Sequence, residues 1–370
     1  MEKKRRRRVL ILRCQVEDFT SNQNLWSCLM AFRLTHLRKP LAYSRSRIPF
    51  SRQVSSFEAV EKAIKCAVET KEYLQIPHLV VSLKEPYQNS KLFSFLSAFH
   101  HHHRIRVIDE ILQSFVPVRP RSLPKIVYSS LLTYCLQSSD PLPLSFAILQ
   151  RTLRSGCLPN TQTHLLLSDA WLERRGRGSQ SFVEIINEMK LIGYSPDTGT
   201  CNYLVSSLCA VDKLDEAVRV VEEMGGAGCI PDIESYGAVI NSMCLARKTS
   251  DVVKIVKEMV SKAGISPRKG MLTKVVAALR ANREIWKAIE MIEFVESRDY
   301  PVEFETYEVL VEGCLEVREY ILAGKMVMRM TDKGFIPYIK VRQKVVERLI
   351  SIGEWKLACI VRQRLAELKS

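Results

Sequence analysis

The sequence lacks the signatures of several protein classes. No stretch approaches the roughly 18 to 20 uninterrupted apolar residues that a membrane-spanning helix needs. Neither a glycine-rich phosphate loop nor a Gly-x-Ser-x-Gly motif, which would present a nucleophilic serine, occurs anywhere in it. We therefore expect a protein that is not an enzyme, does not act at a membrane, and has no cofactor or catalytic metal.

The cysteines show no metal-binding or disulfide pattern. There are 11 of them, and none forms a Cys-x-x-Cys pair. An odd, scattered set suits a reducing interior better than secretion. Cys209 and Cys244 lie 35 residues apart in equivalent sequence surroundings, so we interpret them as small packing residues between helices.

Positive charge is abundant but unevenly placed. The chain has 55 Lys and Arg against 40 Asp and Glu, a formal net charge of +15. Residues 1–56 hold 13 of the basic and 3 of the acidic residues, which leaves 42 basic and 37 acidic residues in the remainder. Most of the net charge therefore belongs to the N-terminal segment, and it says little about the rest of the chain.

That N-terminal segment, residues 1–55, has the composition of a transit peptide. No acidic residue occurs between Phe19 and Phe57, where arginines alternate with Ser, Leu and Phe. Such Arg- and Ser-rich, acid-poor segments direct proteins to organelles, so we expect a mitochondrial protein, with the chloroplast as the alternative. Met30 is a possible second start, because the run Lys3–Arg8 fits a presequence poorly and a nuclear-type basic tag better.

A proline recurs through the remainder at an almost constant interval. The spacings are 37, 35, 36, 34 and 36 residues, and a glycine precedes five of the six prolines by three residues. The prolines are Pro159, Pro196, Pro231, Pro267, Pro301 and Pro337. Self-similarity at this period predicts a helical solenoid, in which each repeat buries its apolar faces against its neighbours.

The clearest repeat is Thr198–Asp232. A first helix is predicted over Thr200–Cys209, with one apolar stripe made of Tyr203, Leu204, Leu208 and Cys209. A second helix is predicted to begin after Asp212, which we expect to cap it. Gly228 and Pro231 end the second helix. Helices of this length are marginal alone in water, so the pair must stack on others.

We divide the helical part into two regions. Residues 56–123 are expected to form divergent cap repeats, with helices over Phe57–Tyr73, Leu92–Phe99 and Val107–Phe115 and a solvated loop at His100–His103. Residues 124–370 are expected to form the regular array, with units at about 125–160, 161–197, 198–232, 233–268, 269–303, 304–338 and a C-terminal cap at 339–370.

The repeat resembles the pentatricopeptide repeat of plant organellar proteins in its P-type form. In Thr198–Asp232 the matching residues are Cys201-Asn202-Tyr203-Leu204-Val205, Cys209, Glu216-Ala217, Glu223-Met224 and Gly228-Cys229-Ile230-Pro231-Asp232. The following unit matches through Ser235-Tyr236, Cys244, Glu258-Met259 and Gly264-Ile265-Ser266-Pro267. The resemblance covers about two-thirds of the chain and implies an all-α solenoid that coils as a right-handed superhelix.

The resemblance also implies binding of single-stranded RNA, one base per repeat, read by the fifth and last residues of each unit. The implied contact residues here are Asn202, Asp232, Ser129, Asn160, Thr273 and Asp197. Asn202 with Asp232 matches a uridine-preferring pair, and Ser129 with Asn160 an adenine-preferring one. Asp232 is equally explained as a cap of the following helix.

The remaining pairs depart from the family pattern. They are Leu165 with Asp197, Gly237 with Arg268, Thr273 with Glu303, and Glu308 with Tyr338. Leu165 and Gly237 have no side-chain hydrogen-bonding group, and we expect Glu308 to bring an unfavourable carboxylate toward RNA. Two functions therefore stay open, namely RNA binding in organellar RNA processing, stability or translation, and a protein-interaction scaffold such as one on the organellar ribosome.

Overall fold

The architecture is described here from a computed structural model. It describes residues 57–81, 92–120, 125–138, 141–178 and 181–368. All of these belong to one unit of the chain, Ser56–Ser370. The predicted transit peptide at residues 1–55 and the second start at Met30 lie outside the described residues.

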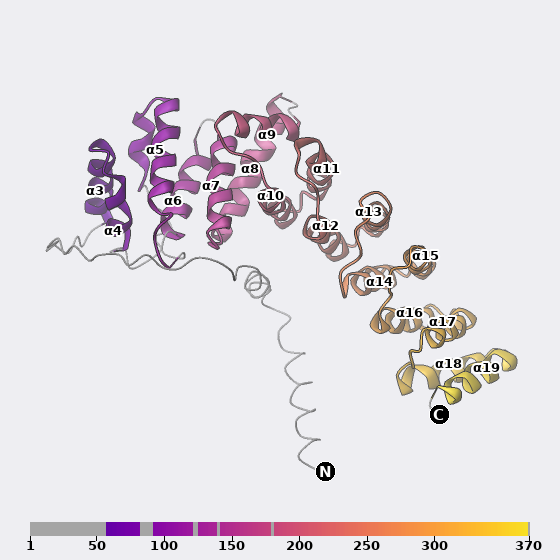
Figure 1. Cartoon of the computed structure of the whole chain (residues 1–370). Coiled ribbons are helices and arrows are strands. Elements are labelled where there is room, and N and C mark those ends of the chain that lie inside the picture. Colours follow the sequence, from indigo (N-terminus) through magenta and orange to yellow (C-terminus); the bar gives the residue numbers. More distant parts are fainter. Residues whose placement is uncertain (1–56, 82–91, 121–124, 139–140, 179–180, 369–370) are drawn as a thin grey trace, which may run out of the picture. The chain divides into compact units, whose positions relative to one another are not determined.

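The described residues form seventeen α-helices and no β-strand (Figure 1). The N-terminal region contains α3 (Phe57–Glu69), η1 (Tyr73–Gln75), α4 (Ile76–Val81), η2 (Ser94–Ala98) and α5 (His101–Ser114). The first helices of the successive units are α6 (Lys125–Leu136), α8 (Thr161–Gly178), α10 (Thr198–Ala210), α12 (Ile233–Leu245), α14 (Met271–Ala281), α16 (Phe304–Glu316) and α18 (Ile339–Ser351). The second helices are α7 (Leu142–Arg154), α9 (Phe182–Leu191), α11 (Leu214–Met224), which is extended by η3 (Gly225–Ala227), α13 (Thr249–Ser261), α15 (Ile285–Glu296), α17 (Tyr320–Asp332) and α19 (Trp355–Glu367).

The helices stack in chain order, which confirms the predicted all-α solenoid. Each first helix contacts the second helix of its own unit, except that α8 and α9 are joined chiefly through their neighbours. Each first helix also contacts the first helix of the next unit, continuously from α6 to α18. The second helices meet less regularly, with looser junctions between α11 and α13 and between α15 and α17. The first helices thus form the closer-packed side of the array.

This close packing changes which residues are buried. In α10 we expected one apolar stripe that included Tyr203 and Cys209, but both are only half-buried. Instead Cys201 and Val205 are buried along with Leu204 and Leu208, because α10 lies between α8 and α12 and is covered on two sides. A fully buried aliphatic side chain contributes about 1.5–3 kcal/mol, so this coverage stabilises helices too short to persist alone.

The turn between the two helices of a unit has the same backbone form in five successive units. In each, one residue is left-handed, with φ between 55° and 84°, and backbone hydrogen bonds close the end of the first helix. These residues are Asp212, Arg247, Arg283, Arg318 and Gly353. The expectation that Asp212 caps the second helix is therefore wrong, because its left-handed backbone ends the first helix and Lys213 occupies the cap position of α11.

The second recurrent turn precedes the proline of each unit. Gly156, Gly193, Gly228, Gly264 and Gly334 are all left-handed there, a conformation that glycine adopts without steric cost. The unit that ends at Pro301 lacks this glycine, and Asp299 takes the left-handed conformation with φ 60°. Asp is among the residues that tolerate this conformation best after glycine, so the repeat geometry persists without the sequence landmark.

The N-terminal region differs from the expectation in two places. The helix expected over Leu92–Phe99 is a short 3-10 helix, Ser94–Ala98, and the one expected over Val107–Phe115 begins earlier, at His101. The predicted histidine loop is therefore wrong from His101 onward, because those histidines form the exposed first turn of α5. No group of three or more potential metal ligands is gathered among the described residues.

The repeated cysteines lie in the helix packing. Cys209 and Cys244 are half-buried and Cys314 is buried. Burial raises the pKa of the Cys209 and Cys244 thiols to about 11 and that of Cys314 to about 12. A thiol with so high a pKa is a poor nucleophile at neutral pH, which agrees with the packing interpretation. Within the described ranges, no helix is both long and apolar enough to cross a membrane.

The left-handed arginines predict an unusual stabilising substitution. Arg283 is exposed and has φ 59°, a conformation that costs a residue with a Cβ about 1–2 kcal/mol. Replacing Arg283 by Gly should therefore raise the free energy of unfolding by about 0.5–1 kcal/mol, measured by urea denaturation. Arg280→Gly, within α14, should lower it, and a loss of stability in Arg283→Gly comparable to that of Arg280→Gly would contradict the argument.

Candidate nucleic-acid interface

The predicted contact residues lie where one first helix meets the start of the next. The fifth residue of a unit is in the first turn or two of its first helix. The last residue immediately precedes the first helix of the following unit, except that Arg268 lies three residues before the start of α14 at Met271. Because consecutive first helices are in contact, the two positions approach each other across each junction. Whether they contact each other depends on the side chains, which differ from unit to unit.

Asn202 and Asp232 are joined directly. The Asn202 side-chain nitrogen Nδ2 donates a hydrogen bond to Oδ1 of Asp232 at 3.0 Å. The amide oxygen Oδ1 of Asn202 accepts a hydrogen bond from the hydroxyl of Ser235 at 2.5 Å. Asn202 is only 7% exposed, so its amide is held in one orientation rather than free in solvent.

Asp232 also begins the next helix. Its Oδ1 accepts hydrogen bonds from the backbone nitrogens of Glu234 and Ser235 at 2.9 and 3.0 Å, and it is the N-cap of α12. Its own backbone nitrogen donates to the Ser235 hydroxyl oxygen at 3.0 Å, which completes a reciprocal capping box. The capping role weighed for Asp232 is therefore present, and it coexists with the contact to Asn202.

This junction leaves two polar groups of the pair without a protein partner in the described part of the chain. One is the second proton on Nδ2 of Asn202, because an amide nitrogen has two donors and only one is used. The other is Oδ2 of Asp232, since the hydrogen bonds of this carboxylate within the described residues all go to Oδ1. The pair can thus offer one donor and one charged acceptor to a ligand.

Asp197 and Asn160 repeat the capping arrangement without a partner in the preceding first helix. Asp197 Oδ1 accepts hydrogen bonds from the Thr200 backbone nitrogen and hydroxyl at 2.9 and 2.6 Å. Asn160 Oδ1 accepts the same two bonds from Thr163 at 2.9 and 2.8 Å. Among the described residues, no hydrogen bond joins Ser129 to Asn160.

In the unit of Leu165 and Asp197, the aspartate charge is paired within the protein and the other residue is apolar. Oδ2 of Asp197 pairs with Nε of Arg154 at 3.0 Å, so its negative charge is offset within the protein. Leu165 is 55% exposed, and it presents an apolar surface where the neighbouring unit has an amide. This unit can contact a base through its face but cannot read its polar edge with Leu165.

Thr273 is tied to the next helix in a different way. Its hydroxyl lies 2.8 Å from the hydroxyl of Thr306. Glu303, its predicted partner, instead uses Oε2 to accept a hydrogen bond from the Gly270 backbone nitrogen at 2.8 Å. No hydrogen bond joins Thr273 to Glu303 among the described residues. Arg268, opposite Gly237, is likewise occupied by an ion pair with Glu234.

Glu308 corrects the expectation of a carboxylate facing RNA. It is 6% exposed, and its Oε1 accepts a hydrogen bond from the Tyr338 backbone nitrogen at 2.6 Å, while Oε2 is buried with no partner in the described residues. Burial, helped by the negative charge of Glu312, raises the pKa of Glu308 against the lowering effect of that hydrogen bond. A buried carboxyl with a raised pKa is not presented to RNA as an exposed carboxylate would be.

Sequence reasoning missed the hydroxyl residues that hold these junctions together. They stand three residues after the last residue of the preceding unit: Thr163, Thr200, Ser235 and Thr306. All four are buried. The signal was available, because Asn or Asp followed by Ser or Thr at this spacing is a capping pattern.

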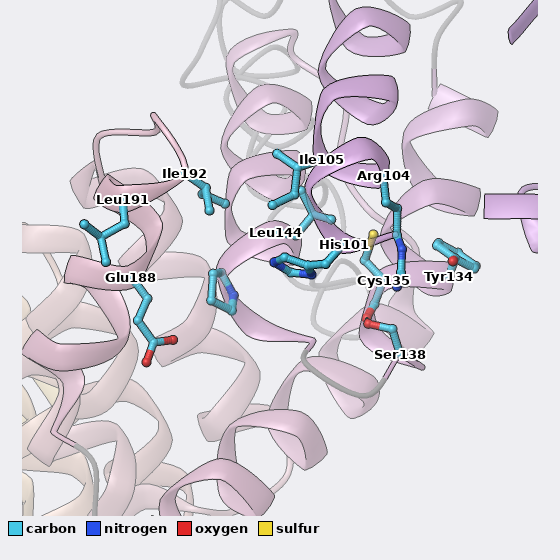
Figure 2. A pocket seen from close by; sticks show the side chains of 11 residues that line it. His101, Arg104, Ile105, Tyr134, Cys135, Ser138, Leu144, Glu188, Leu191 and Ile192 are labelled. Atoms are coloured by element: carbon cyan, nitrogen blue, oxygen red, sulfur yellow. The ribbon is translucent and has the colours of Figure 1, made fainter. Parts of the chain in front are cut away.

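A separate cavity of about 340 Å³ lies between α5, α6, α7 and α9. Figure 2 shows Glu188 and Leu191 on one side of it and Arg104 with Tyr134 on the other. Burial raises the pKa of Tyr134, and the nearby Arg104 opposes that change. Burial also raises the pKa of Cys135 in its wall to about 12. The cavity gathers no activated nucleophile, so it offers no evidence for catalysis.

These observations define a class of protein: an α-solenoid of helix pairs whose polar junctions lie along the first helices. Comparison with known proteins places it more closely. Residues 196–245 match a model described as the PPR repeat family, and residues 234–262 match a model described as the PPR repeat. A pentatricopeptide repeat-containing protein of Arabidopsis thaliana is 91% identical over 344 residues, which are 92% of this chain and all of the relative.

The chain therefore belongs to the pentatricopeptide repeat family. Solved structures of this family show more distant similarity. The crystal structure of PPR10 from maize is 13% identical with a TM-score of 0.38, and the match covers 85% of this chain and 55% of PPR10. The PPR domain of protein-only RNase P 1 of Arabidopsis thaliana, solved in complex with tRNA, is 16% identical with a TM-score of 0.31, and covers 51% of this chain and 98% of that domain.

The buried Glu308 predicts a pH dependence. Its pKa is raised in the folded protein, so the stability it contributes is present below the unfolded pKa and is lost as pH rises through the folded pKa. Wild type should therefore lose stability relative to Glu308→Gln as the pH rises above the ordinary glutamate pKa of about 4.5, measured by urea denaturation at each pH. Glu305→Gln, at an exposed position on the same helix, removes the same charge and is the control. Parallel curves for wild type and Glu308→Gln would contradict the assignment.

Proposed function

We propose that this protein binds single-stranded RNA and acts, without catalysis, in the processing, stability or translation of an organellar transcript. The observation that carries the proposal is the Asn202–Asp232 pair, fixed in geometry and still holding one donor and one acceptor. Membership of the pentatricopeptide repeat family supports it, as does the tRNA bound to the related RNase P domain.

The unpaired groups fit the Watson–Crick edge of uracil. Uracil presents a carbonyl oxygen, which can accept from the free proton of Asn202, next to its N3–H group, which can donate to Oδ2 of Asp232. Cytosine presents a ring acceptor in place of N3–H, and an acceptor facing a carboxylate would be left unpaired, at a cost of about 1–3 kcal/mol. The pair should thus favour uridine over cytidine.

The rest of the array supports a small footprint. Asp197 is offset by Arg154, Leu165 and Gly237 bring no polar side-chain atom, and Glu308 is buried. Ser129, Asn160 and Thr273 keep polar groups at junctions without forming the predicted pairs. We infer that base reading is concentrated in one unit and that neighbouring units contribute contacts of low sequence specificity.

We place the protein in the mitochondrion, with the chloroplast as the alternative. This proposal is supported by the acid-free, arginine- and serine-rich stretch between Phe19 and Phe57. C-terminal fluorescent fusions begun at Met1 and at Met30 should both reach the organelle. A diffuse cytosolic signal from both would overturn the proposed location.

A second candidate function is a protein-interaction scaffold, such as one associated with the organellar ribosome. The departures at Leu165, Gly237 and Glu308 favour it, since a protein partner needs no base-reading pair at each junction. Crosslinking in purified organelles distinguishes the two functions. A footprint on one transcript supports the first, and recovery of ribosomal RNA alone, or of no RNA, supports the second.

The base preference predicts the effect of two variants. Asn202→Ala with Asp232→Ala should weaken binding to a uridine-containing oligonucleotide by roughly tenfold, because two hydrogen bonds of about 0.5–1.5 kcal/mol each are removed. Asp232→Asn should instead shift the preference from uridine toward cytidine, since the new amide can donate where Oδ2 accepted. Fluorescence anisotropy with matched uridine and cytidine oligonucleotides measures both effects.

The Asp232→Asn variant is also the control for folding. Asparagine caps a helix about as well as aspartate, so this variant should keep the wild-type melting temperature while the double alanine variant loses the cap. An unchanged uridine preference in Asp232→Asn would argue against base reading by this unit and leave Asp232 as a cap alone.

A further inference from the structure

The net positive charge of the helical part lies entirely in its last unit. Residues 339–370 contain 8 basic and 3 acidic residues, a net charge of +5. Residues 57–338 contain 34 of each sign and are neutral overall. A terminal repeat needs a polar outer face for solubility, but that requirement is met by charges of either sign. Solubility therefore does not explain why the net charge of the last unit is positive.

Three of these cations form a stripe along α18. Lys340, Lys344 and Arg348 follow one another at intervals of four residues, so they lie on one helix face. All three are exposed. The adjacent stripe, Val341 with Val345 and Leu349, is buried against the preceding helices. The packing of α18 therefore fixes the direction in which the cations point, in a row about two turns long.

The surroundings leave the charge of the stripe largely uncompensated. Arg348 lies over the Tyr320 ring, 5.9 Å from its centre, a contact that leaves the guanidinium charged. Lys344 lies near Glu316, whose pKa is lowered chiefly by the hydrogen bond from Arg280 and to a smaller extent by Lys344. Arg280 holds that carboxylate through two hydrogen bonds of 2.8 and 2.5 Å. Glu316 is thus already neutralised when Lys344 reaches it.

The chemistry of the stripe selects among partners. A second copy of this chain would bring +5 against +5 at the same end, which is unfavourable. A phosphate backbone offers a regular row of negative charges, which lysine and arginine bind without regard to base identity. The first helices are in unbroken contact from α10 to α18, so a strand that follows them from Asn202 reaches α18 four units later.

We propose that α18 is a phosphate anchor for the same RNA strand whose base is read at Asn202 and Asp232. The inference rests on the proposed function and assigns a separate task to the last unit. It supplies salt-sensitive, sequence-independent affinity, while the third unit supplies base preference. With one base per repeat, the strand must extend about four nucleotides past the read uridine to engage the anchor.

The test compares salt dependence in the full chain. The variant Lys340→Gln with Lys344→Gln and Arg348→Gln is titrated with a labelled oligouridine of about 16 nucleotides between about 50 and 200 mM KCl. Each lost phosphate contact lowers the slope of log affinity against log salt by about 0.7 on a single strand, so the slope should fall by about 2. The preference for uridine over cytidine should stay unchanged.

A matched control removes the same charge elsewhere. Lys213→Gln with Lys254→Gln and Lys325→Gln changes three exposed lysines outside the last unit and should keep the wild-type slope. All the substituted side chains are exposed, so both variants should melt at the wild-type temperature. A slope for the α18 variant that equals that of the control would overturn the anchor.

Three further outcomes are informative. Polyglutamate at equal charge should compete poorly with oligouridine, and equal competition would assign the stripe to an acidic protein surface instead and overturn the proposal. Failure of wild type to bind any oligonucleotide would overturn both the proposed function and the anchor. Loss of the anchor effect alone, with the uridine preference still abolished in the Asn202 and Asp232 alanine variant, would leave the proposed function standing.

Discussion

Every helix pair in this array depends on its neighbours for stability. The helices are mostly 10 to 13 residues long, too short to persist alone in water, and each first helix is covered on two sides by the first helices before and after it. The junction between first helices is therefore where burial is greatest. It is also where the polar groups that begin each new helix must be satisfied, because the backbone donors at a helix start have no partner within the helix.

The protein meets that requirement with side chains at the end of the preceding unit. Asp197 and Asp232 both accept hydrogen bonds from the first turn of the next helix, and a buried Ser or Thr completes each junction. Among the described junctions, only at Asp232 does the arrangement extend to an amide on the previous first helix. The difference between the junction at Asp197 and the proposed base-reading junction at Asp232 is thus a single side chain, Asn202, where the neighbouring unit has Leu165.

Net charge also differs between the last unit and the rest of the array. In the middle, ion pairs such as Lys257–Glu290 and Arg329–Glu293 link successive second helices. Exposed pairs of this kind stabilise by about 0–1 kcal/mol each, and they leave the region electrically neutral. In the last unit Arg364 pairs with Asp332 at 3.1 Å, whereas Lys340, Lys344 and Arg348 form no ion pair within the described residues. Affinity and base preference can therefore be located in different units of one continuous surface.

Much of the fold could be predicted from the sequence, because the repeat length and the residues that end helices are visible locally. The recurrent prolines and glycines locate the unit ends, and the helix pairs follow from apolar spacing. Details that depend on neighbouring units could not be predicted in this way. Neither the prolines nor the apolar spacing indicates the left-handed conformation of Asp212, the 3-10 helix at Ser94–Ala98 or the helical histidines from His101 onward.

The candidate site likewise has parts that could be predicted from the sequence and parts that could not. The pair Asn202–Asp232 could be anticipated from the family resemblance, and the structure joins the two side chains. The hydrogen bonds of Glu308 to the Tyr338 nitrogen and of Glu303 to the Gly270 nitrogen could not, since both depend on which backbone nitrogen at the start of a helix is within reach. Their roles in RNA contact remain predictions.

The double duty of Asp232 limits how such a site can change. A residue that starts a helix and also faces a ligand must be short and must accept a hydrogen bond, so only a few amino acids are compatible with both tasks. Any new specificity at this position has to be drawn from that small set, or the helix start must be stabilised by other means, as at Tyr338, whose backbone nitrogen is held by Glu308. The set of bases that a repeat can distinguish is therefore limited by the need to start a helix at this position as well as by the chemistry of the bases.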